Sequence, residues 1–334
     1  MTATVAPDTS VAHRVATGSW LPGYLALAVI WGSSFLFIKI GVRELHPLYV
    51  TLGRAGSGAL TVLVVLFVTR GRLPRDLRVW GHLAVVGAVG VAIPFTLFGY
   101  GEQRVSSVLA GIWNATTPLI ALPVAVLAMR TERMNLRRAV GIGVGFLGVL
   151  TVLGVWRGVG GSQLTGQLMC LGAAVCYGVA IPYQRRFLGG MPDSGVAIPA
   201  GQLVMATVQL LVVAPLVAGA PPAPTSLSAD VVGSVLALGA LGTGLAFVLN
   251  FRVIQYAGAS TSASVTYLIP IVATAIGVVG LGEALEWYQP VGAIVVLAGV
   301  AVSQGLLWPA HRGSHRAAMR ERQSTPAADR RATS

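Results

Sequence analysis

Charged residues are scarce in this sequence. Of 334 residues only 10% are charged, 11 are acidic and one, Lys39, is a lysine, whereas 54% are hydrophobic and the mean hydropathy is +0.75. Soluble domains carry about 25% charged residues. A chain with so little charge is unable to cover a water-facing surface, so the composition argues against a soluble enzyme and favours a membrane protein.

Cysteines are few and the common catalytic motifs are missing. Cys170 and Cys176 lie six residues apart in one apolar segment, where they point to different faces of a helix and are unsuited to a disulfide. The sequence has no HExxH, GxSxG or Walker A motif. Gly143, Gly145 and Gly148 match GxGxxG, but they lie in the middle of an apolar segment, where small residues serve helix packing. We therefore expect a protein that is not an enzyme, with no catalytic residue, cofactor or metal site.

Long apolar runs dominate what is present. A helix needs about 20 apolar residues to cross a bilayer. Ten such runs follow one another along the chain, at 21–41, 47–69, 79–101, 106–129, 136–155, 165–187, 195–218, 230–251, 259–281 and 288–308. The sequence therefore predicts an all-α integral membrane protein with ten transmembrane helices.

The basic residues are sorted between the two sides of these spans. With both termini inside, 18 of the 23 fall in inner segments, four (Lys39, Arg43, Arg104 and Arg157) fall in outer ones, and Arg54 lies within a span. Positive residues accumulate on the cytoplasmic side of membrane proteins. We expect an N-in, C-in protein of the cell inner (plasma) membrane. Nucleic acid is not an expected partner, because its binding needs one basic face.

The chain also repeats itself. At an offset of 152, seven residues of the first half match the second: Gly87, Ala88, Gly90, Phe95, Leu97, Gln103 and Pro118 meet Gly239, Ala240, Gly242, Phe247, Leu249, Gln255 and Pro270. After a one-residue slip, Glu132, Gly141 and Gly148 meet Glu283, Gly292 and Gly299. Each half holds five spans, and an odd number places the two copies in opposite orientations, as in many secondary transporters. We expect a cytoplasmic tail at 1–19, five-helix repeats at 20–156 and 164–308, and a disordered cytoplasmic tail at 309–334.

With these features the chain resembles the drug/metabolite transporter superfamily, in particular the EamA-type ten-helix permeases. The resemblance rests on Trp31-Gly-Ser-Ser-Phe35, on Arg54, on the paired prolines Pro118 and Pro270, and on the Leu281-Gly-Glu283 ending of the ninth span. Thr131-Glu132 in the first half lacks the usual glycine. The resemblance covers residues 20–308 and implies export or exchange of small metabolites, often amino acids or toxic compounds, without ATP.

Polar residues inside the spans are candidates for a substrate cavity, because they are costly in hydrocarbon. The spans contain polar or aromatic residues near mid-depth and two prolines that interrupt helical hydrogen bonding. The predicted cavity residues are Trp31, Ser34, Arg54, Asn114, Thr117, Pro118, Tyr177, Asn250, Ser264, Tyr267 and Pro270. Hydrogen bonds between helices and core packing are the alternative roles for this set.

Ionisable residues in the spans are almost absent. Arg54 is the one charge well inside a span, either as an anchor for a substrate carboxylate or gate residue, or as a structural partner of carbonyls, Glu44 or Glu102. Lys39 is expected to extend its ammonium to the outer surface. Every acid lies at or beyond a span end, so simple proton antiport has no support, although Glu102 or Glu283 could still couple.

Together these features predict a secondary transporter that moves a small polar or amphipathic metabolite, amino-acid-like or drug-like, by alternating access. Efflux is the preferred direction. The alternatives are an uptake permease of the same fold and a non-transporting membrane sensor or interaction protein. The expected partners are the small-molecule substrate, the lipid bilayer and a second copy of the chain, contacted through spans five and ten.

Overall fold

The computed structural model describes residues 20–157, 161–189 and 194–307, and every regular element in these ranges is helical. Nine helical segments in the described part are long and apolar enough to cross a membrane, and a further apolar helix has 17 residues. The elements are α1 (Leu21–Gly41), α2 (Pro47–Val68), α3 (Leu77–Gly87), η2 (Ala88–Ala92), α4 (Ile93–Glu102), α5 (Ser107–Asn114), α6 (Thr117–Leu127), α7 (Leu136–Leu153), η3 (Val155–Arg157), α8 (Gly161–Leu188), α9 (Ser194–Ala218), η4 (Pro224–Ser226), α10 (Ala229–Gly239), η5 (Ala240–Leu245), α11 (Ala246–Ser264), η6 (Val265–Tyr267), α12 (Ile269–Leu281) and α13 (Tyr288–Gln304).

Short polar segments set where these helices begin and end. The Ser106 side chain accepts a hydrogen bond from Leu109 N at 3.1 Å at the start of α5, and Asn135 does the same for Arg138 N at the start of α7. Such caps satisfy amide groups that have no partner inside the helix. α12 ends at Gly282, whose φ of 65° is a left-handed conformation that favours glycine.

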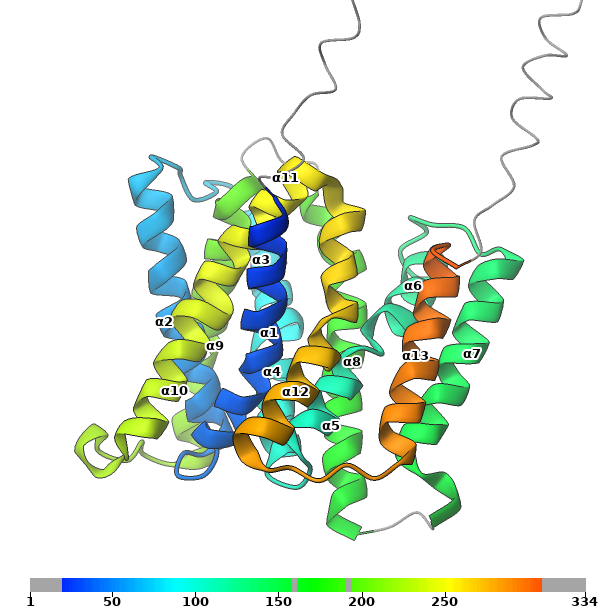
Figure 1. The fold of residues 1–334 in the computed structure, drawn as a ribbon. Helices are drawn as coiled ribbons and strands as arrows, with labels where there is room; N and C mark the ends of the chain where they lie inside the picture. The colour runs from blue at the N-terminus through cyan, green and yellow to red at the C-terminus, as the bar shows by residue number, and fades with distance from the viewer. Residues whose placement is uncertain (1–19, 158–160, 190–193, 308–334) are drawn as a thin grey trace, which may run out of the picture.

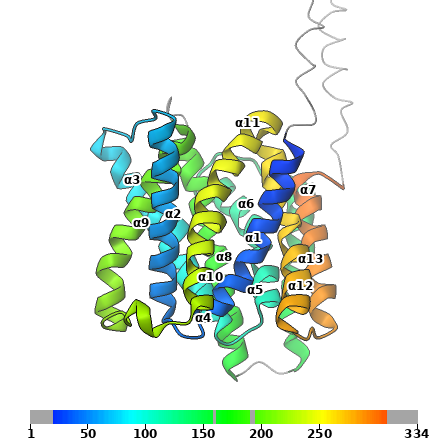
Figure 2. The ribbon, with the colours of Figure 1, turned by 60° about the vertical axis from the view of Figure 1, so that its left-hand side comes forward.

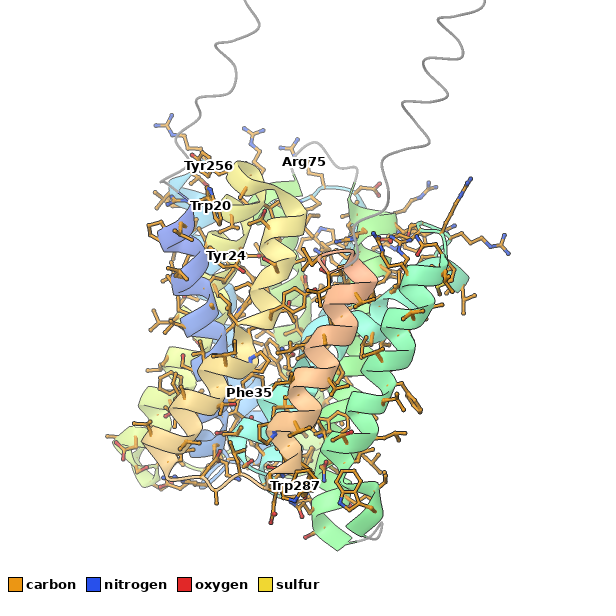
Figure 3. All side chains as sticks on the ribbon, turned by 45° about the vertical axis from the view of Figure 1, so that its right-hand side comes forward. Trp20, Tyr24, Phe35, Arg75, Tyr256 and Trp287 are labelled. Carbon is orange, nitrogen blue, oxygen red and sulfur yellow. The ribbon has the colours of Figure 1, made fainter. Side chains whose placement is uncertain are left out.

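The helices form a bundle with α7 and α13 side by side at one flank, as both ribbon views show (Figures 1 and 2). α1 begins and α13 ends at the same end of the bundle, called here the termini end; the opposite end is the distal end (Figure 1). Aromatic side chains lie near both ends, with Trp20 and Tyr256 at the termini end and Trp287 at the distal end (Figure 3). Tryptophan and tyrosine favour the two surfaces of a bilayer, so this arrangement fits a membrane-spanning bundle.

Glycines bring α7 and α13 into close contact. A Cβ placed on Gly299 would lie 2.3 Å from the backbone nitrogen of Gly145, and one on Gly148 would lie 2.5 Å from that of Val296. Small residues allow the backbones of membrane helices to approach in this way. The glycine faces of the fifth and tenth predicted spans are therefore occupied within the chain. A contact between two copies would use other faces of these helices, and it stays a prediction.

The same irregularities occur in both halves at the offset of 152. The π-helical segment η2 joins α3 to α4, and the π-helical segment η5 joins α10 to α11. The fourth predicted span is interrupted between α5 and α6, just before Pro118, and the ninth is interrupted by η6, just before Pro270. π-Helical turns and prolines redirect a helix locally and free backbone groups. These breaks bring backbone and polar side chains toward the middle of the bundle.

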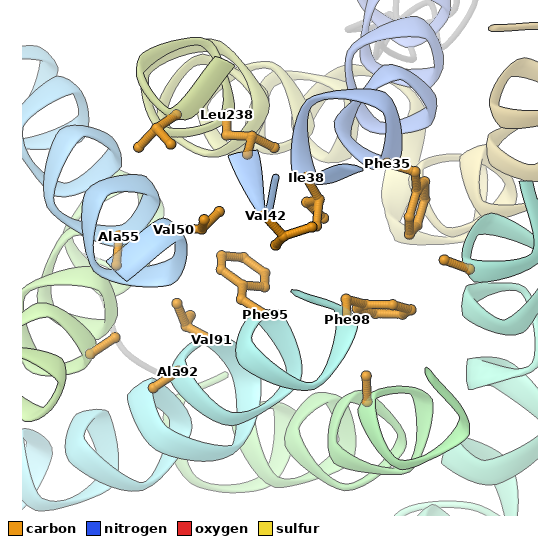
Figure 4. Packing of buried hydrophobic residues seen from close by; sticks show 14 of the residues in the cluster. Phe35, Ile38, Val42, Val50, Ala55, Val91, Ala92, Phe95, Phe98 and Leu238 are labelled. Atoms are coloured by element: carbon orange, nitrogen blue, oxygen red, sulfur yellow. The ribbon is translucent and has the colours of Figure 1, made fainter. Parts of the chain in front are cut away.

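The hydrophobic core surrounds that middle region. Phe35 and Ile38 of α1, and Val42 directly after it, point toward Phe95 and Phe98 of α4 (Figure 4). All five side chains are at most 8% exposed. Because the phenylalanine rings are packed by neighbours on several helices, α1 and α4 hold one wall of the space described below in a fixed position.

Candidate functional site

A cavity of about 190 Å³ lies in the middle of the bundle and is called here the central cavity. Both halves of the chain contribute to its wall. The lining residues are Trp31, Ser34, Phe35, Ile38, Arg54, Gly90, Phe95, Phe98, Asn114, Thr117, Tyr177, Ile181, Gly242, Phe247, Thr266 and Ile269. Gly90 belongs to η2 and Gly242 to η5, so the two π-helical segments meet the same space. A mostly apolar wall, rich in aromatic rings and with a few polar groups, is typical of small-molecule sites.

A second cavity, of about 530 Å³, adjoins the central one on the side of the termini end and is called here the inner cavity. Thr117, Ile181 and Thr266 line both spaces. The wall of the inner cavity also includes Glu132, in the segment after α6, and Arg185, in the last turn of α8. The inner cavity thus continues the space around Thr117, Ile181 and Thr266 toward the termini end.

At the distal end, Glu283 fastens the end of α12 to the start of α5. Its carboxylate accepts hydrogen bonds from the backbone N–H and the hydroxyl of Ser107, both at 2.8 Å, and from Val108 N at 3.1 Å. A carboxylate is favourable there because the first amides of a helix lack partners and carry partial positive charge. The Glu of the Leu-Gly-Glu sequence thus has a structural role in this conformation.

The matching glutamate of the first half is placed differently. Arg130, in the segment that follows α6, has a φ of 52°, and Gly282, directly after α12, has a φ of 65°. Glu132 comes two residues after Arg130, whereas Glu283 comes one residue after Gly282. The extra residue is the physical origin of the one-residue slip in the repeat. The carboxylate of Glu132 pairs with Arg138 at 2.5 Å and Arg185 at 3.7 Å, in the wall of the inner cavity.

Lys39 also closes the distal end, and the expectation that it extends to the surface is wrong. Its ammonium group donates to the backbone carbonyl of Glu102, and to that of Val105 at 2.7 Å. Both carbonyls lie at or just beyond the C-terminal end of α4, where carbonyls lack helical partners and carry partial negative charge. The lysine therefore joins α1 to the end of α4.

Glu102 is buried more deeply than its place at the end of a span suggests. Its side chain is fully buried, and neither carboxylate oxygen has a hydrogen-bond partner in the described part of the chain. Sequence position alone does not reveal this burial, because it arises from the way α4 packs against α8. Gly101 and Gly166 show how close the two helices are: a Cβ on Gly166 would lie 3.0 Å from the carbonyl oxygen of Gly101.

Arg54 reaches the central cavity from α2. The residue is 7% exposed, its Nε donates to the Thr243 hydroxyl at 3.0 Å, and its Cζ lies 3.6 Å from the centroid of the Phe95 ring. A cation over an aromatic face is attracted by the negative charge of that face. Glu44, one of the structural partners considered, instead accepts a hydrogen bond from Ser228 N at 2.8 Å.

Phe35, Phe95, Phe98 and Tyr177 form an aromatic cluster beside the arginine. The ring centroids of Phe35 and Phe98 are 5.5 Å apart, those of Phe98 and Tyr177 are 6.2 Å apart, and those of Phe95 and Tyr177 are 6.5 Å apart. The three phenylalanines were not among the predicted cavity residues. In an apolar span they resemble ordinary core or lipid-facing residues, and the spacing of Phe95 and Phe98, three apart on one helix face, was the available signal.

The structure brings most of the predicted cavity residues together. Trp31, Ser34, Arg54, Asn114, Thr117 and Tyr177 line the central cavity, and Pro118 lines the inner one. Four others lie outside the lining of these two cavities, namely Asn250, Ser264, Tyr267 and Pro270. The Ser262 hydroxyl donates to Asn250, Ser264 pairs with the Tyr24 hydroxyl at 2.9 Å, and Tyr267 packs against the cluster around Leu119. Thr266 and Ile269, on neighbouring positions, contact the cavity instead.

The helical bundle, the two adjoining cavities and the apolar spans are those of a multi-pass membrane transporter, and comparison with known proteins agrees. The sequence profile described as the EamA-like transporter family matches residues 18–154 and again residues 164–304. The chain belongs to the EamA-like transporter family.

Several similar proteins are named as transporters, and the match covers nearly their whole length. The chain is 26% identical to the uncharacterized transporter YoaV of Bacillus subtilis, over 83% of this chain and 94% of that protein. It is 25% identical to a probable amino-acid metabolite efflux pump of Salmonella typhimurium, over 84% and 94% of the two chains. It is 28% identical to a probable terminal-alkyne amino-acid exporter of Streptantibioticus cattleyicolor, over 83% and 90%. One crystal structure shares the fold, with a TM-score of 0.61, 20% identity, and coverage of 86% of this chain and 97% of that one.

Proposed function

We propose that this protein is a secondary transporter that exports a small amphipathic metabolite across the cell inner membrane through the central cavity. The observation that supports it is the position of the two adjoining cavities. The central cavity is lined by both halves, it adjoins the inner cavity toward the termini end, and Lys39 and Glu283 close the distal end. A site near the middle of two related halves, accessible from one side, is the arrangement that alternating access requires.

In this proposal the chain has ten spans in two inverted repeats, with both termini in the cytoplasm. The excess of arginine in the segments at the termini end supports that orientation. The described conformation is then the inward-open one, with the cavity available to cytoplasmic solutes. Release outside requires the contacts of Lys39 and Glu283 to separate and the inner cavity to close.

The direction is proposed from relatives. Two of them are named as an efflux pump and an exporter, of an amino-acid metabolite and a terminal-alkyne amino acid. Export also fits an aromatic, mostly apolar cavity that accepts amphipathic compounds. An uptake permease would move solute along the same route in the opposite direction. A sensor would leave the solute concentrations inside and outside the cell unchanged.

The proposal is tested by comparing the metabolites released from cells with and without the protein. We expect a set of small metabolites to accumulate outside only when the wild-type protein is made, and Asn114→Leu to reduce that release, because leucine fills polar space in the cavity. Depletion from the medium would indicate uptake. An unchanged pool on both sides would contradict a transport function and favour a sensor.

Topology is tested separately by reporter fusions after residues 75, 160 and 320. The proposal predicts inside, outside and inside for these positions. Any other order contradicts two inverted five-span repeats, whatever the outcome of the release experiment.

A further inference from the structure

The described lining of the central cavity contains one charged residue and no acid. Among the described residues that line it, Arg54 is the only charged side chain, and the remaining ones are aromatic, aliphatic or neutral polar. Arg54 also makes no salt bridge within 4.0 Å with any described acid, Glu102 included. An arginine inside a membrane protein normally pairs with an acid or with carbonyls, because an isolated buried charge is costly.

The free part of the guanidinium group faces the cavity. Only Nε is used within the protein, in its bond to Thr243, and no hydrogen bond among the described residues involves the two terminal nitrogens. Those nitrogens are also absent from the polar atoms that are fully enclosed without a partner. Phe95 covers one face of the group. What remains open is the edge with two parallel N–H groups, which matches the two oxygens of a carboxylate.

The neutral polar groups of the cavity favour an anion too. The Trp31 indole N–H, the Tyr177 hydroxyl and the Asn114 amide have no hydrogen-bond partner among the described residues and are not fully enclosed. An indole donates only, and a hydroxyl and an amide are able to donate. No carboxylate in the lining is available to pair with an ammonium group. The site therefore offers several donors and one positive charge to a ligand, and no negative charge.

We propose that the substrate is an organic monocarboxylate with an apolar body, whose carboxylate binds the free edge of Arg54 while its body lies against the aromatic cluster. This rests on the proposed function and names its substrate class. A single planar cation suits a single planar anion, whereas a phosphate dianion would remain half compensated. Because no acid lines the cavity, an α-ammonium group is not required for binding, and deaminated analogues of amino acids bind as the amino acids do.

The test is binding to the purified full-length protein, read as a rise in its melting temperature, since a ligand that binds only the folded state raises it. The probes are acids with matched amides: butyrate, 4-methylpentanoate, phenylacetate and leucine, against butyramide, 4-methylpentanamide, phenylacetamide and leucinamide. We expect concentration-dependent stabilisation by acids, 4-methylpentanoate included, and none by the amides or by inorganic phosphate. The amides control for apolar partition into detergent.

Variants locate the effect. Arg54→Gln is expected to weaken binding of the acids by about tenfold or more, because it removes a charge-assisted, two-point contact. Arg54→Lys keeps the charge but loses the planar fork, so an intermediate affinity is expected. Arg252→Gln, which alters an exposed arginine of the second half, should bind as the wild type does. If Arg54→Gln fails to show a cooperative melting transition, the affinity of Arg54→Lys and the comparison of acids with amides on the wild type still test whether Arg54 binds a carboxylate.

Three results would overturn the inference: amides that stabilise as well as acids, acids that bind Arg54→Gln unchanged, or no acid that stabilises the wild type. Its failure is distinguishable from failure of the transport proposal. Export of neutral or cationic metabolites alone would leave the transporter and remove the carboxylate site. Carboxylate binding through Arg54 without any export would leave the carboxylate site and contradict the transport proposal.

Discussion

Arg54 Nε donates to the Thr243 hydroxyl at 3.0 Å, which joins α2 of the first half to η5 of the second. The same hydroxyl donates to Leu238 O, five residues earlier in the chain, at 3.0 Å. Thr243 is fully buried and is therefore held on both sides. Phe95 covers one face of the guanidinium group and so sets the orientation of its plane. The bond to Thr243 restricts rotation within that plane and therefore sets the direction of the open edge.

Replacing Thr243 tests this positioning. Thr243→Val nearly keeps the shape of the side chain but removes the hydrogen-bond partner of Arg54. We expect the affinity for 4-methylpentanoate to fall by about tenfold, because one hydrogen bond to a charged group is lost. Thr243→Ser keeps the hydroxyl and should recover most of the affinity. The measurement is the dependence of melting temperature on ligand concentration. Equal affinity in Thr243→Val and the wild type would show that Arg54 is positioned by Phe95 alone.

Glu283 is expected to stabilise the described conformation. Glu283→Ala removes three hydrogen bonds to the start of α5 and should lower the free energy of unfolding by about 1–3 kcal/mol. Melting in detergent measures it, with Gln103→Ala, an exposed change near the same end, as control. If the two variants melt alike, the carboxylate contributes nothing net at the distal end.

The contact of α7 with α13 offers a matched pair of glycines. Gly299→Ala places a methyl group against the backbone of Gly145 and should cost about 1–3 kcal/mol of stability, since the two helices must separate. Gly143, on α7, has no atom within 4 Å of an added Cβ, so Gly143→Ala should be neutral or stabilise by up to about 1 kcal/mol through helix propensity. Similar melting temperatures for both variants would contradict the close contact of these helices.

Glu44 gives a dependence on pH at the distal end. Hydrogen bonds from the backbone N–H and hydroxyl of Ser228 lower the pKa of this exposed carboxyl group. A lowered pKa in the folded state means that the contribution to stability is present above the unfolded pKa and is lost as the pH falls through the folded one. The difference in melting temperature between the wild type and Glu44→Gln should therefore shrink as the pH is lowered from neutral into the acid range. A constant difference would show that ionised Glu44 is not what holds Ser228.

The broad architecture follows from the sequence because hydrophobic length and repeated residues are local properties. Pro118 of α6 and Pro270 of α12, and likewise η2 and η5, lie at positions that the offset of 152 relates. The matching glycines of α7 and α13 lie at an offset of 151, after the one-residue slip. Arg54, Asn114 and Tyr177 could be selected because a polar group inside a span is rare and costly.

What the sequence could not provide depends on packing between distant segments. Lys39 turns to the carbonyls of Glu102 and Val105, because the end of α4 lies beside it and offers better partners than the surface. Asn250 and Ser264 have the polarity expected of a cavity residue, but they bond to Ser262 and Tyr24 instead. Phe95 and Phe98 are ordinary apolar residues until the fold places them against Arg54 and Tyr177.

The most direct test of the account is to block the central cavity chemically while release of metabolites is followed. The test uses Asn114→Cys, which places a cysteine in the cavity wall, in a protein whose Cys170 and Cys176 are replaced by alanine. Gly143→Cys in the same background is the control outside the cavity. We predict that a small charged thiol reagent modifies Asn114→Cys and reduces release to the level of cells without the protein, and that release by the Gly143→Cys control continues. Undiminished release by fully modified Asn114→Cys would contradict transport through this cavity.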